Sequence, residues 1–176
     1  PDAGRFDTSS MRAWGSGAAP LPREIVGPFE SKFGGVILEG YGLTEASPVV
    51  SAHRLSGVRK LGSVGPAIPG VEIAILDDGD RCLPAREVGE VGVRGPNVMQ
   101  GYYHRSDETA AALRNGWLHT GDMGRLDEDG YLYIVERKKD LIIRGGFNIY
   151  PREVEDVLYA HPAVAEAAVV GMPDAL

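Results

Sequence analysis

The sequence predicts a mixed α/β protein made of three successive segments, and two changes of hydrophobic pattern along the chain carry this prediction. Over residues 1–60, apolar residues at helical spacing lie between two short apolar runs, which indicates strand, helix and strand. Over residues 61–138, short strand-like runs alternate with Gly, Pro and Asp, which indicates a small β-barrel or a folded sheet. Residues 139–176 return to strand, loop, helix and strand, as expected for a small α+β unit.

The first segment is expected to bring a ligand-binding motif to the end of a strand. A buried strand over residues 11–16 leads into the small residues 17–20, and Pro22 suits the first turn of the helix that follows. The apolar face of this helix contains Ile25, Val26, Phe29 and Phe33. The helix would end at the glycines 34–35, and a strand over residues 36–39 follows. Ligands of open α/β sheets gather at the carboxyl ends of such strands.

The later segments carry two further helices and several strands. In the second segment we expect strands over residues 71–76, 90–94 and 131–135. A helix between the capping Ser106 and the terminating Asn115 interrupts them. In the third segment Pro151 opens a helix, and a strand is expected over residues 164–170. The apolar face of that last helix contains Val154, Val157 and Leu158.

The most informative motif is GYGLTE, from Gly40 to Glu45, which we interpret as a glycine-framed turn. Tyr41 offers a ring that can lie against a purine, Thr44 a hydroxyl for a phosphate oxygen, and Glu45 a carboxylate for a hard cation. The flanking Gly40 and Gly42 let the backbone approach a ligand closely. An exposed Thr-Glu pair also often caps a helix, here one starting near Glu45, and this alternative stays open.

Two further motifs follow this one along the chain. The first is GWLHTGD at residues 116–122, followed by an acidic turn at residues 127–130, and the second is ERKKDLIIRGGFNIYPREVE at residues 136–155. In this order and spacing, the three motifs resemble those of the adenylate-forming (ANL) superfamily, which includes AMP-binding acyl-CoA synthetases, adenylation domains and luciferases. The resemblance covers essentially the whole chain.

The resemblance implies a division of the chain into three structural parts. Residues 1–60 would be the end of a doubly wound α/β subdomain, residues 61–138 a small distorted β-barrel subdomain, and residues 139–176 the start of a mobile C-terminal domain. The family also has an upstream phosphate-binding loop and a downstream lysine, and this sequence shows neither. We therefore expect the chain to be a C-terminal portion of a fatty-acid CoA ligase, truncated within its last domain.

The resemblance also implies a ligase reaction in two steps. A carboxylate would attack the α-phosphate of ATP to give acyl-AMP and pyrophosphate, and the thiol of coenzyme A would then take the acyl group and release AMP. Mg²⁺ is expected because the first step needs charge neutralised on the phosphates. The run at residues 141–151 resembles fatty-acyl or aryl CoA ligases, so a medium- or long-chain fatty acid is the expected substrate. Acyl chain length stays open.

Two alternatives to this function stay open. One is an adenylation domain that loads the thiol of a carrier protein instead of coenzyme A. The other concerns this chain alone, which would be a noncatalytic nucleotide-binding fragment because both phosphate-handling elements are missing.

The resemblance assigns the nucleotide contacts. Tyr41 would stack on adenine, and Asp122 would accept hydrogen bonds from both ribose hydroxyls, with Arg137 as a second ribose contact. Thr44 would hold an oxygen of the α-phosphate, and Glu45 would ligate Mg²⁺. The second wall of the adenine site would be formed by Ala18, Ala19 and Pro20.

Lys139 resembles the hinge about which the small domain rotates between the two reaction steps, and Gly145 and Gly146 would let the pantetheine arm of coenzyme A pass close to the backbone. Simple structural roles remain open for these residues. Lys139 would then belong to a solvated basic linker, and Gly145 and Gly146 would form a turn between strands. In the same way, residues 17–20 would form a tight turn and residues 120–122 an ordinary loop.

Composition restricts the class of protein and its partners. The net charge of -7 argues against a general nucleic-acid surface, because such a surface needs concentrated positive potential. No apolar run reaches the roughly 18 residues that would span a membrane. The single cysteine, Cys82, cannot form an internal disulfide, so a reducing, cytoplasmic setting is expected. The expected partners are the acid, ATP and coenzyme A, and the oligomeric state stays open.

Overall fold

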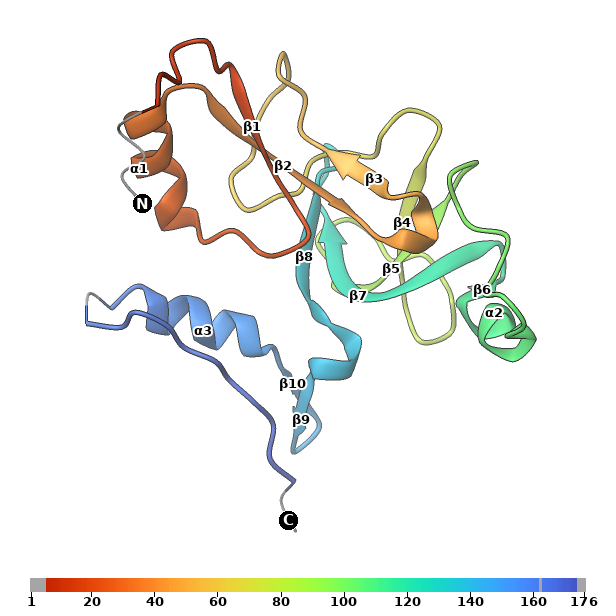
Figure 1. The fold of residues 1–176 in the computed structure, drawn as a ribbon. Coiled ribbons are helices and arrows are strands. Elements are labelled where there is room, and N and C mark those ends of the chain that lie inside the picture. The colour runs from red at the N-terminus through yellow and green to blue at the C-terminus, as the bar shows by residue number, and fades with distance from the viewer. Residues whose placement is uncertain (1–5, 162, 174–176) are drawn as a thin grey trace.

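The computed structural model describes residues 6–161 and 163–173. Figure 1 shows three parts: a small sheet with its helix, a larger curled sheet beside it, and a hairpin followed by a helix that lies below both. This mixed α/β architecture confirms the predicted fold class. Among the described residues, no helix is long and apolar enough to cross a membrane.

The small sheet has the strand order β1-β2-β3. Strand β1 (Ala13–Ser16) pairs in parallel with β2 (Val36–Gly42), and β3 (Val49–Ala52) pairs with β2 in the antiparallel sense. Helix α1 (Arg23–Phe33) connects the two parallel strands, as a crossover connection requires. These elements confirm the strand, helix and strand predicted for the first segment.

Helix α1 begins and ends close to the predicted positions. Pro22 is its N-cap, and Gly34 and Gly35 adopt positive φ angles of 69° and 70°, a conformation that favours glycine. The predicted apolar face is only partly buried, because Val26 is buried whereas Ile25 is 48% exposed. The helix is instead held by aromatic contacts, in which the ring of Phe29 lies 5.4 Å from that of Trp14 and 4.7 Å from that of Phe33.

The interpretation of residues 40–45 as one turn was wrong for its first half. Gly40, Tyr41 and Gly42 belong to β2, and the register with β3 shifts between Tyr41 and Gly42. The chain turns only in the short 3-10 helix η2 (Thr44–Ala46). A Cβ atom at Gly42 would collide with the carbonyl oxygen of Pro48, so close packing of β2 against the next segment requires glycine there.

The larger sheet has the order β4-β5-β7-β6, with β8 also paired to β7. Its strands are β4 (Glu72–Leu76), β5 (Gly89–Arg94), β6 (Leu113–Arg114), β7 (Trp117–Leu126) and β8 (Leu132–Arg137). The pairings between these strands are antiparallel. The folded sheet predicted for the second segment is therefore confirmed.

Three details of the second segment differ from the prediction. Strand β7 was not predicted, because its residues mix Gly, His, Thr and Asp, and its pairing with β5 and β8 outweighs that weak local preference. Helix α2 (Ser106–Ala112) ends before the expected Asn115, because Leu113 and Arg114 pair with the start of β7. The N-cap of α2 is Arg105, so Ser106 lies inside the helix and does not cap it.

Both sheets contribute to one hydrophobic core. Its fully buried members include Val50 from β3, Val91 and Val93 from β5, and Leu132 from β8. Ala46 of η2 packs in the same cluster. The core therefore extends across the expected boundary at residue 60, and it ties the strand that carries Tyr41 to the larger sheet.

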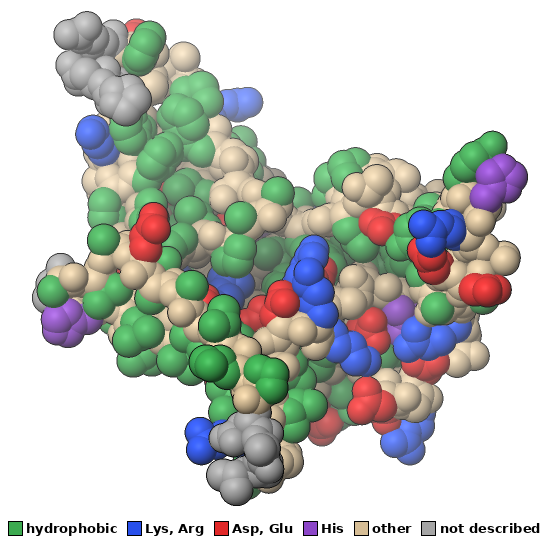
Figure 2. All heavy atoms as spheres, turned by 60° about the horizontal axis from the view of Figure 1, so that its bottom comes forward, with side chains coloured by type: hydrophobic (Ala, Val, Ile, Leu, Met, Phe, Trp, Pro, Cys, Tyr) green, Lys and Arg blue, Asp and Glu red, His purple; other side chains and the backbone are tan. Residues whose placement is uncertain are grey.

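The third part begins with the short 3-10 helix η3 (Lys138–Asp140) and the hairpin of β9 (Ile142–Arg144) and β10 (Phe147–Ile149). Helix α3 (Pro151–Tyr159) opens at the predicted proline. The strand predicted over residues 164–170 was wrong, since that segment pairs with no described strand. The exposed hydrophobic side chains of this third part include Ile143, Phe147, Val157, Val170 and Met172. Figure 2 shows hydrophobic side chains on the surface near this end of the chain.

Candidate functional site

A cavity of about 700 Å³ lies where the small sheet, the larger sheet and η3 meet. Most of the predicted site residues line it, namely Ala18, Ala19, Pro20, Gly40, Tyr41, Gly42, Glu45, Asp122, Arg137 and Lys139. Thr44, Gly145 and Gly146 are not among its lining residues. The structure thus brings together residues from three distant stretches of the sequence.

Asp122 lies at the centre of this arrangement and is only 7% exposed. The hydroxyl of Tyr41 donates a hydrogen bond of 2.6 Å to its Oδ2 atom, and the Nε atom of Arg137 lies 3.3 Å from its Oδ1 atom. Asp122 and Arg137 are direct partners in the register between β7 and β8. Sheet register and a contact from β2 therefore fix the carboxylate from two sides.

Tyr41 stays a neutral donor in this environment. Burial, followed by the neighbouring carboxylate of Asp122, raises the pKa of Tyr41 far above its usual value. The hydroxyl bond also fixes the orientation of the ring, since one edge is tied to Asp122 while the side chain lines the cavity. Tyr41 thus lines the cavity while it also packs against the hydrophobic core.

The backbone around Asp122 is held by side chains of the same strand and of β5. The hydroxyl of Thr120 accepts from the Asp122 N–H at 3.2 Å and donates to the Val91 carbonyl at 2.8 Å. Gly121 adopts a positive φ of 73°, and its N–H donates to Glu90 Oε1 at 3.1 Å. Residues 120–122 therefore form an irregular section of β7, in which a side chain bonds to the backbone and Gly121 departs from extended geometry. We call this section the Asp122 loop.

Glu45 has a partner that the sequence motif does not reveal. The hydroxyl of Tyr102 donates to Glu45 Oε1 at 2.8 Å, and this bond raises the pKa of Tyr102. The backbone is also fixed, since the Met99 N–H donates to the Glu45 carbonyl at 2.8 Å. No local pattern identifies Tyr102, because it lies 57 residues beyond Glu45 in the sequence.

The side chains near Glu45 suit a magnesium ion that is coordinated mainly by phosphate oxygens of a bound nucleotide and by water. Among the described residues, no group of three or more His, Cys, Asp or Glu side chains is arranged to hold a metal ion. Mg²⁺ commonly takes one or two protein carboxylates and completes its shell with water and phosphate oxygens. Glu45, a single carboxylate at the edge of the cavity, fits that kind of site.

The segment before α1 approaches β2 closely. A Cβ atom at Gly17 would lie 3.1 Å from the Gly40 carbonyl oxygen, and Ala18 adopts a positive φ of 67°. Only small side chains therefore lie on this side of the cavity. Thr44 begins η2 beside it, and its carbonyl accepts the Ser47 N–H at 3.2 Å.

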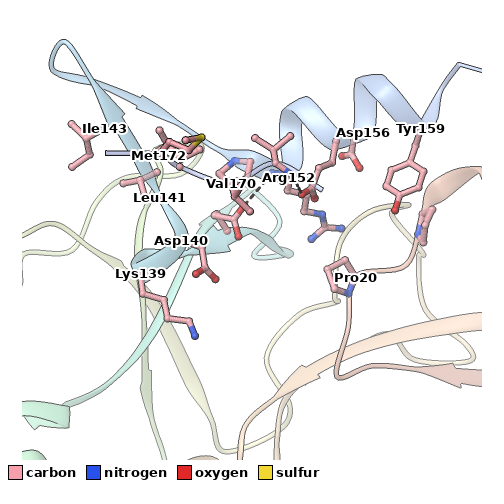
Figure 3. Close-up of a pocket in the computed structure, with 17 residues that line it drawn as sticks. Pro20, Lys139, Asp140, Leu141, Ile143, Arg152, Asp156, Tyr159, Val170 and Met172 are labelled. Atoms are coloured by element: carbon pink, nitrogen blue, oxygen red, sulfur yellow. Dashed lines mark hydrogen bonds between the residues drawn. The ribbon is translucent and has the colours of Figure 1, made fainter. Parts of the chain in front are cut away.

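A second cavity of about 790 Å³ separates the third part of the chain from the Pro20 segment. Figure 3 shows Lys139 and Asp140 on one side of it, Arg152 reaching into it from α3, and Pro20 opposite. Lys139 and Arg152 line both cavities. Residues of η3 and of α3 are therefore shared by the linings of the two cavities.

Gly145 and Gly146 form the two-residue turn between β9 and β10. Their φ angles of 58° and 83° match a type I′ hairpin turn, which requires positive φ at both positions. A Cβ atom at either glycine would meet no described atom within 4 Å. The turn accounts for both glycines here, and their expected role towards coenzyme A stays a prediction.

Comparison with known proteins identifies the family. A family model described as "AMP-binding enzyme" matches residues 2–103, and one described as "AMP-binding enzyme C-terminal domain" matches residues 153–176. The chain belongs to the AMP-binding enzyme family. The first match covers more than half of the chain, and the family is the one that the three sequence motifs resemble.

Several AMP-binding enzymes are similar over nearly the whole chain. A long-chain-fatty-acid CoA ligase of Bacillus subtilis (strain 168) is 51% identical over 176 residues, which are 99% of this chain and 31% of that protein. A 2-succinylbenzoate CoA ligase of Bacillus velezensis is 51% identical over 161 residues, which are 91% of this chain and 32% of that protein. The chain spans about a third of the length of these AMP-binding relatives.

The fold agrees with that of a solved AMP-binding relative. The crystal structure of ATP-bound MatB from Rhodopseudomonas palustris matches with a TM-score of 0.92 and 40% sequence identity. The match covers 99% of this chain and 35% of MatB.

Proposed function

We propose that this chain forms the adenosine-binding part of an ATP-dependent acid–CoA ligase. The complete protein would join a carboxylic acid to AMP with release of pyrophosphate, and would then transfer the acyl group to coenzyme A with release of AMP. The observation that carries the proposal is Asp122, which lines the 700 Å³ cavity with Tyr41 and Arg137 bound to its two oxygens.

Asp122 would bind the ribose. A carboxylate has several lone pairs on two oxygens, so it can accept both vicinal hydroxyls while it keeps its contacts to Tyr41 and Arg137. The Nε of Arg137 lies 3.3 Å from Asp122 Oδ1, and the guanidinium has further N–H groups that would reach a ribose oxygen. The ring of Tyr41 would face the adenine, opposite the small residues Ala18 to Pro20.

Glu45 and Thr44 would act on the phosphates. Glu45 would hold Mg²⁺, and bound Mg²⁺ supplies neutralisation of the charge that develops on the phosphates. Tyr102 keeps the Glu45 carboxylate in place. Thr44 would donate its hydroxyl to the α-phosphate, as its place at the start of η2 allows.

Lys139 would be the hinge between the two steps. It lies in η3, between β8 of the larger sheet and the hairpin of the third part. A change of backbone angles there would move the hairpin and α3 together and would reshape both cavities. Gly145 and Gly146, at the tip of that hairpin, would then face coenzyme A.

For the acid we propose a medium- or long-chain fatty acid. Long-chain-fatty-acid CoA ligases of several bacteria are similar over nearly the whole chain, which supports this choice. The similarity to 2-succinylbenzoate CoA ligases makes a bulkier aromatic acid the closest competitor. For the 176-residue chain by itself we propose nucleotide binding without turnover, because it spans about a third of its relatives.

Calorimetric titration with a nonhydrolysable acyl-adenylate mimic tests the proposal. Asp122→Asn should weaken binding about tenfold or more, because a charge-assisted hydrogen bond contributes roughly 1.5–3 kcal/mol. Asp107→Asn, at an exposed carboxylate in the first turn of α2, is the matched control and should bind like the unmodified chain. Equal affinity of Asp122→Asn and the control would remove Asp122 from the ribose role.

A further inference from the structure

Glu90 is a nearly buried carboxylate outside every predicted site. It lies on β5, is 8% exposed, and lines neither of the two cavities described above. An ionised carboxylate in such a position is costly unless its charge and its lone pairs are matched. The contacts that match them therefore indicate what Glu90 does.

The two oxygens of Glu90 bind two different parts of the candidate site. Oε1 accepts the N–H of Gly121 at 3.1 Å, and Gly121 directly precedes the ribose candidate Asp122. Oε2 accepts from the Nζ of Lys138 at 3.1 Å, and Lys138 lies between Arg137 and Lys139. One side chain thus joins the Asp122 loop and the start of η3 to the same strand.

The surroundings favour the charged form of Glu90. Burial raises its pKa, but the hydrogen bond and the charge of Lys138, together with the neighbouring His119 ring, outweigh burial and hold the pKa below its usual value. His119 Nδ1 lies 3.3 Å from Oε2 at an unfavourable angle, and the guanidinium of Arg114 lies 3.8 Å away. Lys138 is the cation that makes the close contact.

Lys138 depends on Glu90 more than on its other partner. Its Nζ also lies 3.4 Å from Oδ1 of Asp78, but the Asp78 side chain is 98% exposed. Exposed ion pairs contribute little, because water screens them, whereas the Glu90 side chain is only 9% exposed. Loss of the Glu90 contact should therefore free the Lys138 side chain.

We propose that Glu90 is a positioning residue that anchors the fixed side of the hinge and the Asp122 loop to β5. The ion pair with Lys138 confines rotation to Lys139 and the residues beyond it, and it thereby shields Arg137 from the motion of the third part. Separately, the hydrogen bond that Oε1 accepts from the Gly121 N–H holds the backbone next to Asp122 in place. This inference rests on the proposed function for the hinge role of Lys139.

Substitutions at Glu90 can separate the two contacts. Glu90→Gln keeps an oxygen that can accept the Gly121 N–H but removes the charge that holds Lys138. Glu90→Ala removes both contacts. Lys138→Met breaks the same ion pair from the other side with a side chain of similar length, and Asp78→Asn is the matched control because it removes only the exposed partner of Lys138.

The first readout is tryptic cleavage after Arg137 in the native, complete protein, followed by mass spectrometry. Glu90→Gln and Lys138→Met should each raise the cleavage rate about fivefold or more, the double variant should cleave no faster than either, and Asp78→Asn should stay within about twofold. Unchanged cleavage in both single variants would overturn the proposal. An equal rise after Arg94 and Arg125, which lie in β5 and β7, would also overturn it by indicating general unfolding.

The second readout is AMP affinity. Glu90→Gln should bind AMP within about threefold of the unmodified protein, whereas Glu90→Ala should bind about tenfold more weakly. Equal affinities of the two variants would contradict the Oε1 role. Because cleavage is measured without nucleotide, failure of the proposed ribose site, which Asp122→Asn tests, is distinguishable from failure of the anchor.

Discussion

At the scale of single residues, the bond between Tyr41 and Asp122 is the central feature of the candidate site. The two residues lie 81 positions apart, and their side chains meet at 2.6 Å. The motifs at residues 40–45 and 116–122 each indicate a nucleotide contact, but neither indicates that the tyrosine orients the carboxylate. In the proposed site, one hydrogen bond would therefore link the recognition of adenine to that of ribose.

Tyr41→Phe separates stacking from this orientation. The ring remains, while Asp122 loses its donor at Oδ2. We expect AMP affinity to fall about three- to tenfold, because an orienting bond to a charged group is removed whereas the stacking surface is kept. Calorimetric titration measures this, and Tyr103→Phe, at a tyrosine that is 88% exposed, is the control. A loss as large as that of Tyr41→Ala would show that the hydroxyl matters more than the ring.

Tyr102→Phe tests the support of Glu45. The carboxylate loses the donor at Oε1 and gains rotational freedom, so the Mg²⁺ concentration that gives half-maximal pyrophosphate release by the complete protein should rise about three- to tenfold. The maximal rate at saturating Mg²⁺ should change less. An unchanged Mg²⁺ dependence would mean that the bond between Tyr102 and Glu45 has no part in metal binding.

At the scale of elements, sequence pattern predicted those helices and strands whose local preference and tertiary pairing agree. Strand β2 and helix α1 are examples, since apolar spacing, Pro22 and the paired glycines all indicate the same structure. Strand β7 could not be predicted, because its Thr, Gly and Asp residues are placed by two neighbouring strands. Residues 164–170 show the opposite case, in which a strand-like sequence has no described partner.

The same limit applies to the candidate site. Asp122, Tyr41 and Arg137 were predicted as site residues because they stand in recognisable motifs, and all three line one cavity. Glu90 and Tyr102 were missed, because each acts through a partner that is 31 to 57 residues away. Long-range contacts of this kind follow from strand register and packing, which local patterns do not specify.

The element η3 provides a direct test of the hinge. Lys139→Pro would fix φ at that position, so thioester formation in the complete protein should fall at least tenfold more than acyl-adenylate formation. The two half-reactions are measured separately by pyrophosphate release and by acyl-CoA yield. Lys139→Ala, which keeps the backbone free, is the control, and an equal loss of both steps in the proline variant would argue for an ordinary linker.

At the scale of the whole molecule, the cavity proposed to bind the nucleotide is built on a core that both sheets share. Val50 of the small sheet packs in the same cluster as Val91 and Leu132 of the larger sheet. Strand β8, which carries Leu132, also carries Arg137 into the cavity. A substitution that disturbs the packing of this core should therefore also weaken binding in the cavity.

Leu132→Ala is expected to destabilise the chain by about 2–5 kcal/mol, since it removes a fully buried side chain and leaves a cavity. Urea unfolding measures the change, and Leu61→Ala, at a leucine that is 56% exposed, should shift the midpoint little. AMP affinity at low urea should fall in the Leu132 variant as well. Retained affinity in a destabilised chain would show that the cavity is independent of the shared core.

The single cysteine gives this chain a built-in attachment point for a spectroscopic probe. Cys82 is exposed and follows β4, and the same connection to β5 carries Asp78, whose carboxylate reaches Lys138. A thiol-reactive fluorophore would therefore attach at one position of this chain, in the same connection as the exposed partner of Lys138. Its emission polarisation would report tumbling and local order there, and a titration with AMP would show whether the proposed ligand changes them.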